Sequence, residues 1–485
     1  MNKLTALVLL LILHTNIQAD PVIQKFSAKD VAEDLDYLYK TLKISTYNLF
    51  AFTSKSTYDG EYRQLKQKLA ARKDSLGKLE AYNLLQRFAA LARLGHLSLQ
   101  GGTPDVYEAY KAGGGTLFPF GIRIDNNRLF IRHNYTNAPN VKEGDEILAI
   151  NGKPALYCLK ELYAVVAGES NYFKSTIIDM NSFSKKYWEV FGSFPAYRLL
   201  IKSPDSKVSK RITVMPVLCT EFDKVNKGIN EVLQFDRAYR VIDEQTAYFR
   251  PGIFLNMEGQ STSDHKTFEK GEFIHFLDSV FADIRHRKLK NVVIDLRGNP
   301  GGDDSFSDPM IAYFANKPFW FCSRFSVRTS ALTKAFWKGV NDSTLKDIKE
   351  AILSHNDGEV FDTPIPSFPP RTDSFRFTGN AYLLVNRYSY SNAAVTPALV
   401  QDYGFGKVVG EPTADCPTLY AAEHDFKLPH TQFICSYPKA YMVRPNGNTE
   451  SKGVQPDYPV AVKPGTEDNV LEYVLGLISI AGHHR

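Results

Sequence analysis

The stretch YLLVNRYSYSNAAV, residues 382–395, decides how the rest of the chain is interpreted. It opens with the apolar run YLLV, which is too short for a helix and typical of a buried parallel strand. The run breaks at Asn386 and Arg387, and small or helix-tolerant residues follow from Ser391 onward. This order predicts a strand, a sharp loop and a helix, with Ser391 where the helix begins.

A serine at the start of a helix supports two interpretations. Its hydroxyl lies beside free backbone N–H groups and the positive end of the helix. Such a place suits a nucleophile whose attack on a carbonyl creates an oxyanion. A serine there also caps many helices without any chemical role. The stretch around Ser391 alone leaves both interpretations open.

Composition limits the classes of function. The 485 residues suffice for two or three domains, and 58 basic against 53 acidic residues give a net charge of only +5. No long run of Lys or Arg is present, so we predict no nucleic-acid binding. The scattered cysteines leave room for one disulfide, have no metal-binding spacing and are more typical of buried thiols. They are Cys158, Cys219, Cys322, Cys416 and Cys435.

Residues 1–19 have the pattern of a secretory signal. Lys3 is followed by an apolar run at 4–13, and Ala19 precedes a predicted cleavage site at Asp20. The run is shorter than the ~20 residues of a membrane span, although a membrane anchor is the alternative interpretation. We therefore predict export to the periplasm or the extracellular space, with no membrane span after the signal is removed.

Residues 20–100 are predicted to form a helical segment, because apolar residues at 31, 35, 38 and 42 repeat on one helix face. The helical pattern ends at RLGHLSL, residues 93–99, where a turn and an alternating strand begin. His96 lies in that turn. A histidine there is, taken alone, as compatible with a structural role as with catalysis.

Residues 101–215 are interpreted as a β-rich block with a linker at its end. Short strands are predicted at 120–124 and 129–132, and the motif EGDEILAINGK follows at 143–153. The block resembles a PDZ domain. The resemblance implies that peptide tails bind by adding a strand to a sheet edge.

From residue 216 to 485 the pattern is α/β. The run NVVIDLR, residues 291–297, predicts a buried strand that ends in a glycine-rich loop, GNPGG, at 298–302. A helix is predicted at 273–284, and strand–helix–strand order implies parallel pairing with right-handed crossovers. Residues 325–376 are interpreted as an insertion.

Three separated motifs resemble one family. In chain order they are VVIDLRGNPGG at 292–302, VNRYSYSNAA with LVQDYGFGKVVGEPT at 385–413, and ESKGVQPD at 450–457. Together they resemble the tail-specific, or carboxy-terminal processing, serine proteases and their tricorn-like subgroup. The resemblance implies a ClpP/crotonase-like α/β protease core, to which the N-terminal helical segment contributes and into which the PDZ-like domain is inserted.

The resemblance also implies roles for residues near the central stretch. The nucleophile falls on Ser391, not on Ser389. The backbone N–H of Asn392 is implied as one donor to the oxyanion, and the N–H of Gly301 or Gly302 as the other. Glycine at the loop lets the substrate carbonyl approach the backbone closely.

The resemblance implies one of two catalytic bases, and a departure from the family pattern decides between them. One branch of the family uses a lysine, and by position that lysine falls on Cys416, so the Ser–Lys arrangement is absent. The tricorn-like branch implies His96 as base, assisted by Glu450 just ahead of GVQPD. Ser98 and Glu450 both remain candidates for orienting the imidazole of His96. The alternative for Glu450 is a solvated surface carboxylate.

We therefore predict an exported serine endopeptidase that hydrolyses protein or peptide substrates through an acyl-enzyme on Ser391. No cofactor and no metal is assigned, because Asp303 and Asp304 are interpreted as a solvated pair. The alternative is a non-catalytic binding protein on the same fold, as in related retinoid-binding modules. Cys416 and Gly95, which depart from the family pattern, favour that alternative. The other histidines we considered lack matching motifs: His133, His265, His275, His286, His355, His424 and His430.

Overall fold

The computed structural model describes residues 24–136, 138–228, 232–257, 269–341, 346–371, 376–462 and 468–483. The predicted signal at 1–19 and His265 lie outside these residues. Within the described ranges, no helix has both the length and the apolar character that crossing a membrane requires. All five cysteines are buried and none forms a disulfide.

A six-stranded sheet in the order β12-β13-β14-β17-β18-β21 forms the centre of the C-terminal half. Pairing is parallel from β13 to β21 and antiparallel between β12 and β13, so the predicted parallel arrangement is confirmed. The strands are β12 (Ala238–Val241), β13 (Thr246–Arg250), β14 (Asn291–Asp295), β17 (Asn380–Val385), β18 (Lys407–Gly410) and β21 (Tyr458–Pro459).

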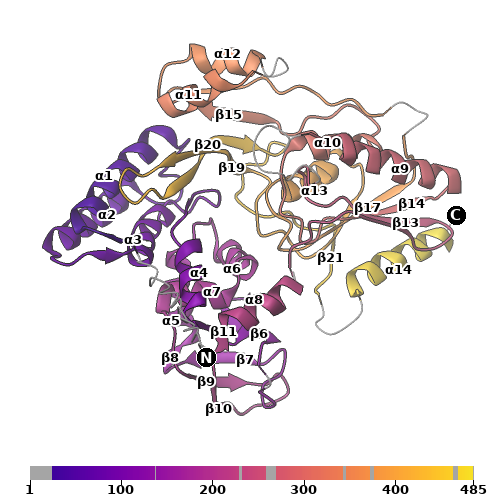
Figure 1. Ribbon diagram of the computed structural model, residues 1–485. Helices are drawn as coiled ribbons and strands as arrows, with labels where there is room; N and C mark the ends of the chain where they lie inside the picture. Colours follow the sequence, from indigo (N-terminus) through magenta and orange to yellow (C-terminus); the bar gives the residue numbers. More distant parts are fainter. Residues whose placement is uncertain are drawn as a thin grey trace, which may run out of the picture.

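Helices cover both faces of this sheet (Figure 1). Val292 and Ile294 of β14 pack in one core with the first group of helices, whereas Val293 packs in a second core with α14. Burial on both faces explains why β14 is apolar throughout. The predicted α/β class is confirmed. The first group is α9 (Gly271–Arg287), α10 (Asp304–Ala312) and α13 (Asn392–Tyr403), and the second face carries α14 (Asn469–His483).

The N-terminal helices pack against a second sheet, in the order β16-β15-β20-β19 with β3 paired to β20. The predicted apolar face of α1 is fully buried, in a core shared with residues of β19 and β20. The N-terminal elements are β1 (Lys25–Phe26), α1 (Ala28–Ser45), α2 (Lys55–Ala71), β2 (Leu76–Gly77), α3 (Lys78–Ala90) and β3 (Ser98–Gln100). The hairpin strands are β19 (Leu419–Lys427) and β20 (Ile434–Val443).

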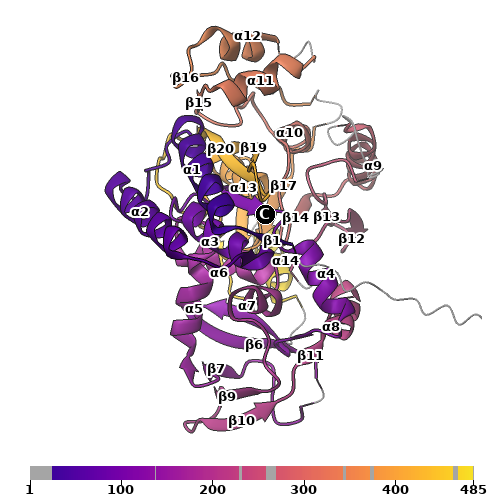
Figure 2. The same ribbon diagram turned by 60° about the vertical axis from the view of Figure 1, so that its left-hand side comes forward.

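Residues 104–228 form a separate unit, at one end of the molecule in both ribbon views (Figures 1 and 2). Its main sheet runs β10-β9-β7-β6-β5, with β8 paired to β7. The strands are β4 (Thr116–Leu117), β5 (Phe120–Asp125), β6 (Arg128–Asn134), β7 (Glu146–Ile150), β8 (Lys153–Pro154), β9 (Tyr197–Lys202), β10 (Lys210–Val214) and β11 (Val217–Leu218). The helices are α4 (Pro104–Ala112), α5 (Ala155–Ala164), α6 (Asn171–Met180), α7 (Phe183–Phe191) and α8 (Cys219–Gly228).

The stretch 155–215 differs from its interpretation as the end of a block and a linker. It forms three helices and two strands, and its apolar side chains share one core with β5 and β6. Aromatic residues pack closely in this core, where Phe118 contacts both Phe183 and Tyr197 edge to face. The unit also extends past 215, because β11 pairs with β4.

Residues 325–376 are joined to the second sheet rather than appended to it. Strand β15 (Arg324–Arg328) pairs antiparallel with β20 and with β16 (Val360–Asp362). Between them lie α11 (Ala331–Gly339) and α12 (Lys346–Ser354), at the end of the molecule opposite β9 and β10 (Figures 1 and 2). The stretch therefore pairs with β20 along the edge opposite β19.

Candidate active site

Ser391 lies in the short loop between β17 and α13, where the sequence predicted a strand, a loop and a helix. Its backbone has φ of 53°, in the left-handed region that residues other than glycine rarely adopt. Ser391 occupies the N-cap position of α13, yet its side chain makes no capping hydrogen bond. The simple capping role is therefore not observed, and the strained backbone is typical of a functional position.

Ser389, two residues earlier, has its hydroxyl fully engaged. It donates to the carbonyl of Leu296 at 2.8 Å and accepts the N–H of Asn386 at 3.1 Å. The side chain is completely buried. Ser389 therefore holds the loop in shape, while the hydroxyl of Ser391 is not committed to any hydrogen bond among the described residues.

The glycine loop at 298–302 lies directly against Ser391. A Cβ placed on Gly301 would lie 2.8 Å from Cβ of Ser391 and 2.9 Å from the backbone nitrogen of Asn392, so only glycine fits. The N–H of Gly301 donates to the side chain of Asn299 at 2.9 Å. Among the described residues, no acceptor is found for the N–H of Asn392 or of Gly302. Of the two glycines considered from sequence, Gly302 thus has the N–H that is free to bind an oxyanion.

His96 lies in the turn between α3 and β3, and its side chain is 6% exposed. The ring stacks on Tyr390, the residue before Ser391, with centroids 5.2 Å apart. Its Nδ1 hydrogen bonds to the carboxylate of Glu423 on β19. Its Nε2 lies 3.3 Å from Oδ2 of Asp415. The imidazole is therefore held on both nitrogens by carboxylates.

Asp415 joins the histidine to the serine. Its Oδ2 also accepts the backbone N–H of Ser391 at 2.7 Å. One oxygen atom thus places Nε2 of His96 and the backbone nitrogen of Ser391 within about 6 Å of each other, since the two contacts measure 3.3 and 2.7 Å. The structure brings Ser391 and His96 together, 295 residues apart in sequence. No hydrogen bond among the described residues links the ring to the hydroxyl of Ser391.

This arrangement favours the protonated form of His96. Ionised carboxylates only accept hydrogen bonds, so each ring nitrogen must carry a proton. Burial opposes the charged form, but Glu423 and Asp415 outweigh burial and hold the pKa of His96 well above 6.5. Burial would likewise raise the pKa of Glu423, yet the charge of His96 lowers it to about 2.

The residue before His96 is Gly95, one of the two departures from the family pattern. A Cβ at Gly95 would lie 2.6 Å from the ring of Phe173 and 3.0 Å from Oε2 of Glu169. Oε1 of Glu169 accepts the N–H of Gly95 at 2.9 Å. Burial, and then the charge of Asp415, raise the pKa of Glu169 to about 7. Crowding from the 104–228 unit therefore explains the glycine.

Glu450 is not brought to His96. It is exposed, in the irregular stretch after β20, where its N–H donates to Asn448 Oδ1 and its carbonyl accepts the N–H of Lys452. Among the described residues, neither a hydrogen bond nor an ion pair connects it to His96. The other orienting candidate, Ser98, lies in β3 opposite Ser436.

Asp415 and Glu423 are the site residues that sequence reasoning missed. Asp415 directly precedes Cys416, the position of the family's lysine, and its Oδ1 accepts the N–H of Cys416 at 2.8 Å. Its place next to Cys416 is the signal in the sequence that could have identified Asp415. Cys416 itself is buried, and burial raises the pKa of its thiol far above neutrality, which keeps it uncharged.

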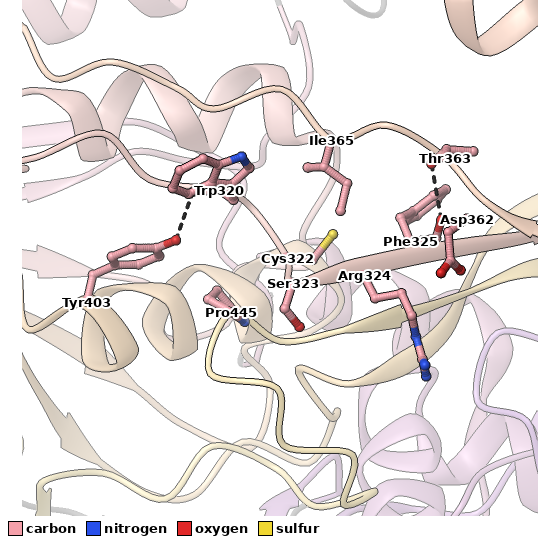
Figure 3. A pocket seen from close by; sticks show the side chains of 10 residues that line it. All are labelled: Trp320, Cys322, Ser323, Arg324, Phe325, Asp362, Thr363, Ile365, Tyr403 and Pro445. Atoms are coloured by element: carbon pink, nitrogen blue, oxygen red, sulfur yellow. Dashed lines mark hydrogen bonds between the residues drawn. The ribbon is translucent and has the colours of Figure 1, made fainter.

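A separate pocket of about 460 Å³ lies at the far end of α13 (Figure 3). Tyr403, the last residue of that helix, lines it, and its hydroxyl accepts the backbone N–H of Trp320 at 3.0 Å. Cys322 also lines the pocket, with its sulfur directed toward Ile365 (Figure 3). None of the predicted site residues lines this pocket, so it is distinct from the site at Ser391.

Comparison with known proteins gives one family and a set of similar folds. Residues 266–460 match Peptidase family S41. Mature CPAF complexed with lactacystin has a TM-score of 0.61 at 15% identity, covering 94% of this chain and 98% of its own. A second structure of mature CPAF gives 0.59 at 15% identity, with 92% and 96% covered. No curated protein sequence matches the chain. At these identities the structures show a shared fold.

Proposed function

We propose that this chain, whose residues 266–460 match peptidase family S41, is an exported serine endopeptidase of proteins or peptides in which Ser391 is the nucleophile and His96 the base. One observation carries the assignment. Asp415 contacts both the N–H of Ser391 and Nε2 of His96, which brings a strained, uncapped serine next to an imidazole. We assign Glu423, in place of Glu450, as the residue that orients His96.

The chemistry follows the usual logic of an activated serine. His96, once neutral at Nε2, accepts the proton of Ser391 as its oxygen attacks the peptide carbonyl, and then donates it to the leaving amine. The N–H groups of Asn392 and Gly302 stabilise the oxyanion, since neither has another partner among the described residues. Water then hydrolyses the acyl-enzyme. Glu423 fixes the ring through Nδ1.

The arrangement described here is a resting one. Nε2 faces Asp415 rather than the hydroxyl, and an imidazolium cannot accept a proton. Activity therefore requires that Asp415 leave Nε2 when the substrate binds, so that Nε2 can turn to Ser391. Hydrogen bonds between catalytic groups are often long or misaligned before substrate arrives, and tighten only in the complex.

Domain organisation and export belong to the same proposal. Residues 20–100 supply His96, and the part of the chain after residue 228 supplies Ser391 and Glu423. We propose that the PDZ-like unit between them, extended to residue 228, binds or admits the substrate chain. The signal at 1–19 directs export. Sequencing the amino terminus of the secreted protein tests this, since cleavage before Asp20 is expected and an intact Met1 would contradict it.

A phosphonofluoridate probe tests the nucleophile. We expect it to label the wild-type protein, and we expect Ser391→Ala to abolish labelling and to lower hydrolysis of unfolded casein by roughly 10³-fold or more. Ser389→Ala is the matched control, because it removes a neighbouring hydroxyl that only supports the loop. Labelling that survives in Ser391→Ala but disappears in Ser389→Ala would overturn the assignment. Absence of wild-type labelling would favour a non-catalytic binding protein.

A further inference from the structure

Lys439, on β20, is a buried cation with no evident purpose in the chemistry described so far. Only 6% of it is exposed. No carboxylate among the described residues lies within ion-pair distance of its ammonium group. In the described part of the chain, its one hydrogen bond is to a backbone carbonyl, that of Ala422, at 2.8 Å. An ammonium group has three N–H donors and is costly to bury, so a lysine used in this way requires an explanation.

The carbonyl that Lys439 binds belongs to an irregular position in the β19–β20 hairpin. Pairing keeps one register from Leu419 opposite Met442 to Lys427 opposite Ile434. It is interrupted at a single place, where Ala422 faces Lys439. Ala422 has φ of 58°, in the left-handed region. The ammonium group thus satisfies a carbonyl at the one position where the strands do not pair.

The residue directly after Ala422 is Glu423, whose carboxylate bonds to Nδ1 of His96. The conformation at Ala422 therefore sets the direction in which Glu423 leaves the strand. The positive charge also acts on the site, because Lys439 contributes to the lowered pKa of Glu423. Burial lowers the pKa of Lys439 itself to about 8, so the group is charged at neutral pH.

We propose that Lys439 is a positioning residue of the peptidase site: its ammonium group holds the Ala422 carbonyl, which aims Glu423 at His96, and its charge partly offsets the carboxylates around the imidazole. The inference rests on the proposed roles of Ser391, His96 and Glu423. It explains why a cation is buried near Glu423 rather than exposed on the hairpin.

The charged groups around Lys439 fix the sign of the expected pH effect. Glu423 and His424 face it from β19, and burial followed by the charge of Lys439 lowers the pKa of His424 to about 3. Arg328 of β15 lies one position beyond the pairing of Val327 with Ala440, and none of the variants below changes it. Removing the charge of Lys439 should therefore raise the pKa of His96, and activity should be lost at a higher pH on acidification.

The test compares Lys439→Met, Lys439→Gln and Lys439→Arg in the full-length protein, with Lys427→Met as the control. Lys427 is an exposed lysine of the same hairpin. We expect Lys439→Met to lower kcat by roughly 10-fold with little change in KM. The loss is only part of what a general base contributes, because His96 is still present. The acid limb of this variant should move to higher pH. Lys439→Arg should restore most of kcat and the acid limb, and Lys427→Met should match wild type.

Two further measurements test the role of Lys439. Lys439→Gln keeps a donor without the charge, so it should shift the acid limb even if Lys439→Met does not fold. Glu423→Gln combined with Lys439→Met should be no worse than Glu423→Gln alone, because both act through one carboxylate. Independent, multiplying losses, or a lowered Tm with an unchanged pH profile, would overturn the role of Lys439. Both outcomes leave the proposed function intact, which only the labelling of Ser391 decides.

Discussion

Ser391 and His96 are held in place by two different kinds of structure. Ser391 lies between a strand and a helix that are buried on both sides, and its loop is fixed by the buried hydroxyl of Ser389 and by close contact with Gly301. His96 lies in a turn, and its ring is held by the carboxylates of Asp415 and Glu423, which come from distant segments.

This difference predicts which part of the site responds to pH. Backbone hydrogen bonds and apolar packing change little with pH, so the loop of Ser391 should keep its shape across the range in which the protein is folded. Ion pairs depend on the charge of each partner. We therefore expect pH and single charge-removing substitutions to act mainly on His96, whereas the nucleophile is exposed to them only through the bond from its backbone N–H to Asp415.

Removing the imidazole should give the largest effect. We expect His96→Ala to lose activity about as completely as Ser391→Ala, by roughly 10³-fold or more, because the neighbouring carboxylate of Asp415 bonds to the backbone N–H of Ser391 and not to its hydroxyl. The double variant should be no worse than either single one, since the two residues act as a unit. Steady-state hydrolysis of a fluorogenic peptide measures this. If His96→Ala keeps most of its activity, another base operates.

Removing the orienting carboxylate should have an intermediate effect. We expect Glu423→Gln to lower kcat by on the order of 10- to 100-fold, because the ring loses the charge that fixes it through Nδ1. Glu450→Gln is the matched control and should be close to wild type, since Glu450 is exposed and bonds to no part of His96. The reverse outcome, a large loss in Glu450→Gln only, would restore the family-implied partner.

The smallest effect should be a shift rather than a loss. The pKa of His96 is raised above 6.5, and a base must be neutral, so wild-type activity should fall on acidification through a midpoint above pH 6.5. Asp415→Asn removes one of the two stabilising charges and should move that midpoint to lower pH. The profile of kcat/KM from about pH 5 to 9 measures it. A midpoint that stays fixed or rises would contradict the role given to Asp415.

Local patterns in the sequence were sufficient for the nucleophile side of the site. The apolar run at 382–385 and the small residues after Ser391 depend only on neighbours along the chain, and the structure has β17 and α13 there. The same holds for β14 and for the buried face of α1. The stretch 155–215 was harder, because its aromatic residues form a compact core without a repeating spacing.

The base side could not be predicted in the same way. Glu423 reaches His96 because Ala422 is left-handed, and alanine gives no sign of that conformation in a sequence. Whether Gly301 or Gly302 has a free N–H depends on the side chain of Asn299. These contacts join residues far apart in the chain. A single sequence does not show which of several carboxylates will contact His96.

The pairing of β3 with β20 has a consequence for when this protein can act. Residues 98–100 join residues 434–436, so the turn that carries His96 is fixed against its partners only after β20 has been made. A chain still on the ribosome contains the histidine but neither carboxylate in place, and for most of its synthesis no Ser391 either. We therefore expect proteolytic capacity to arise only after β20 has paired with β3.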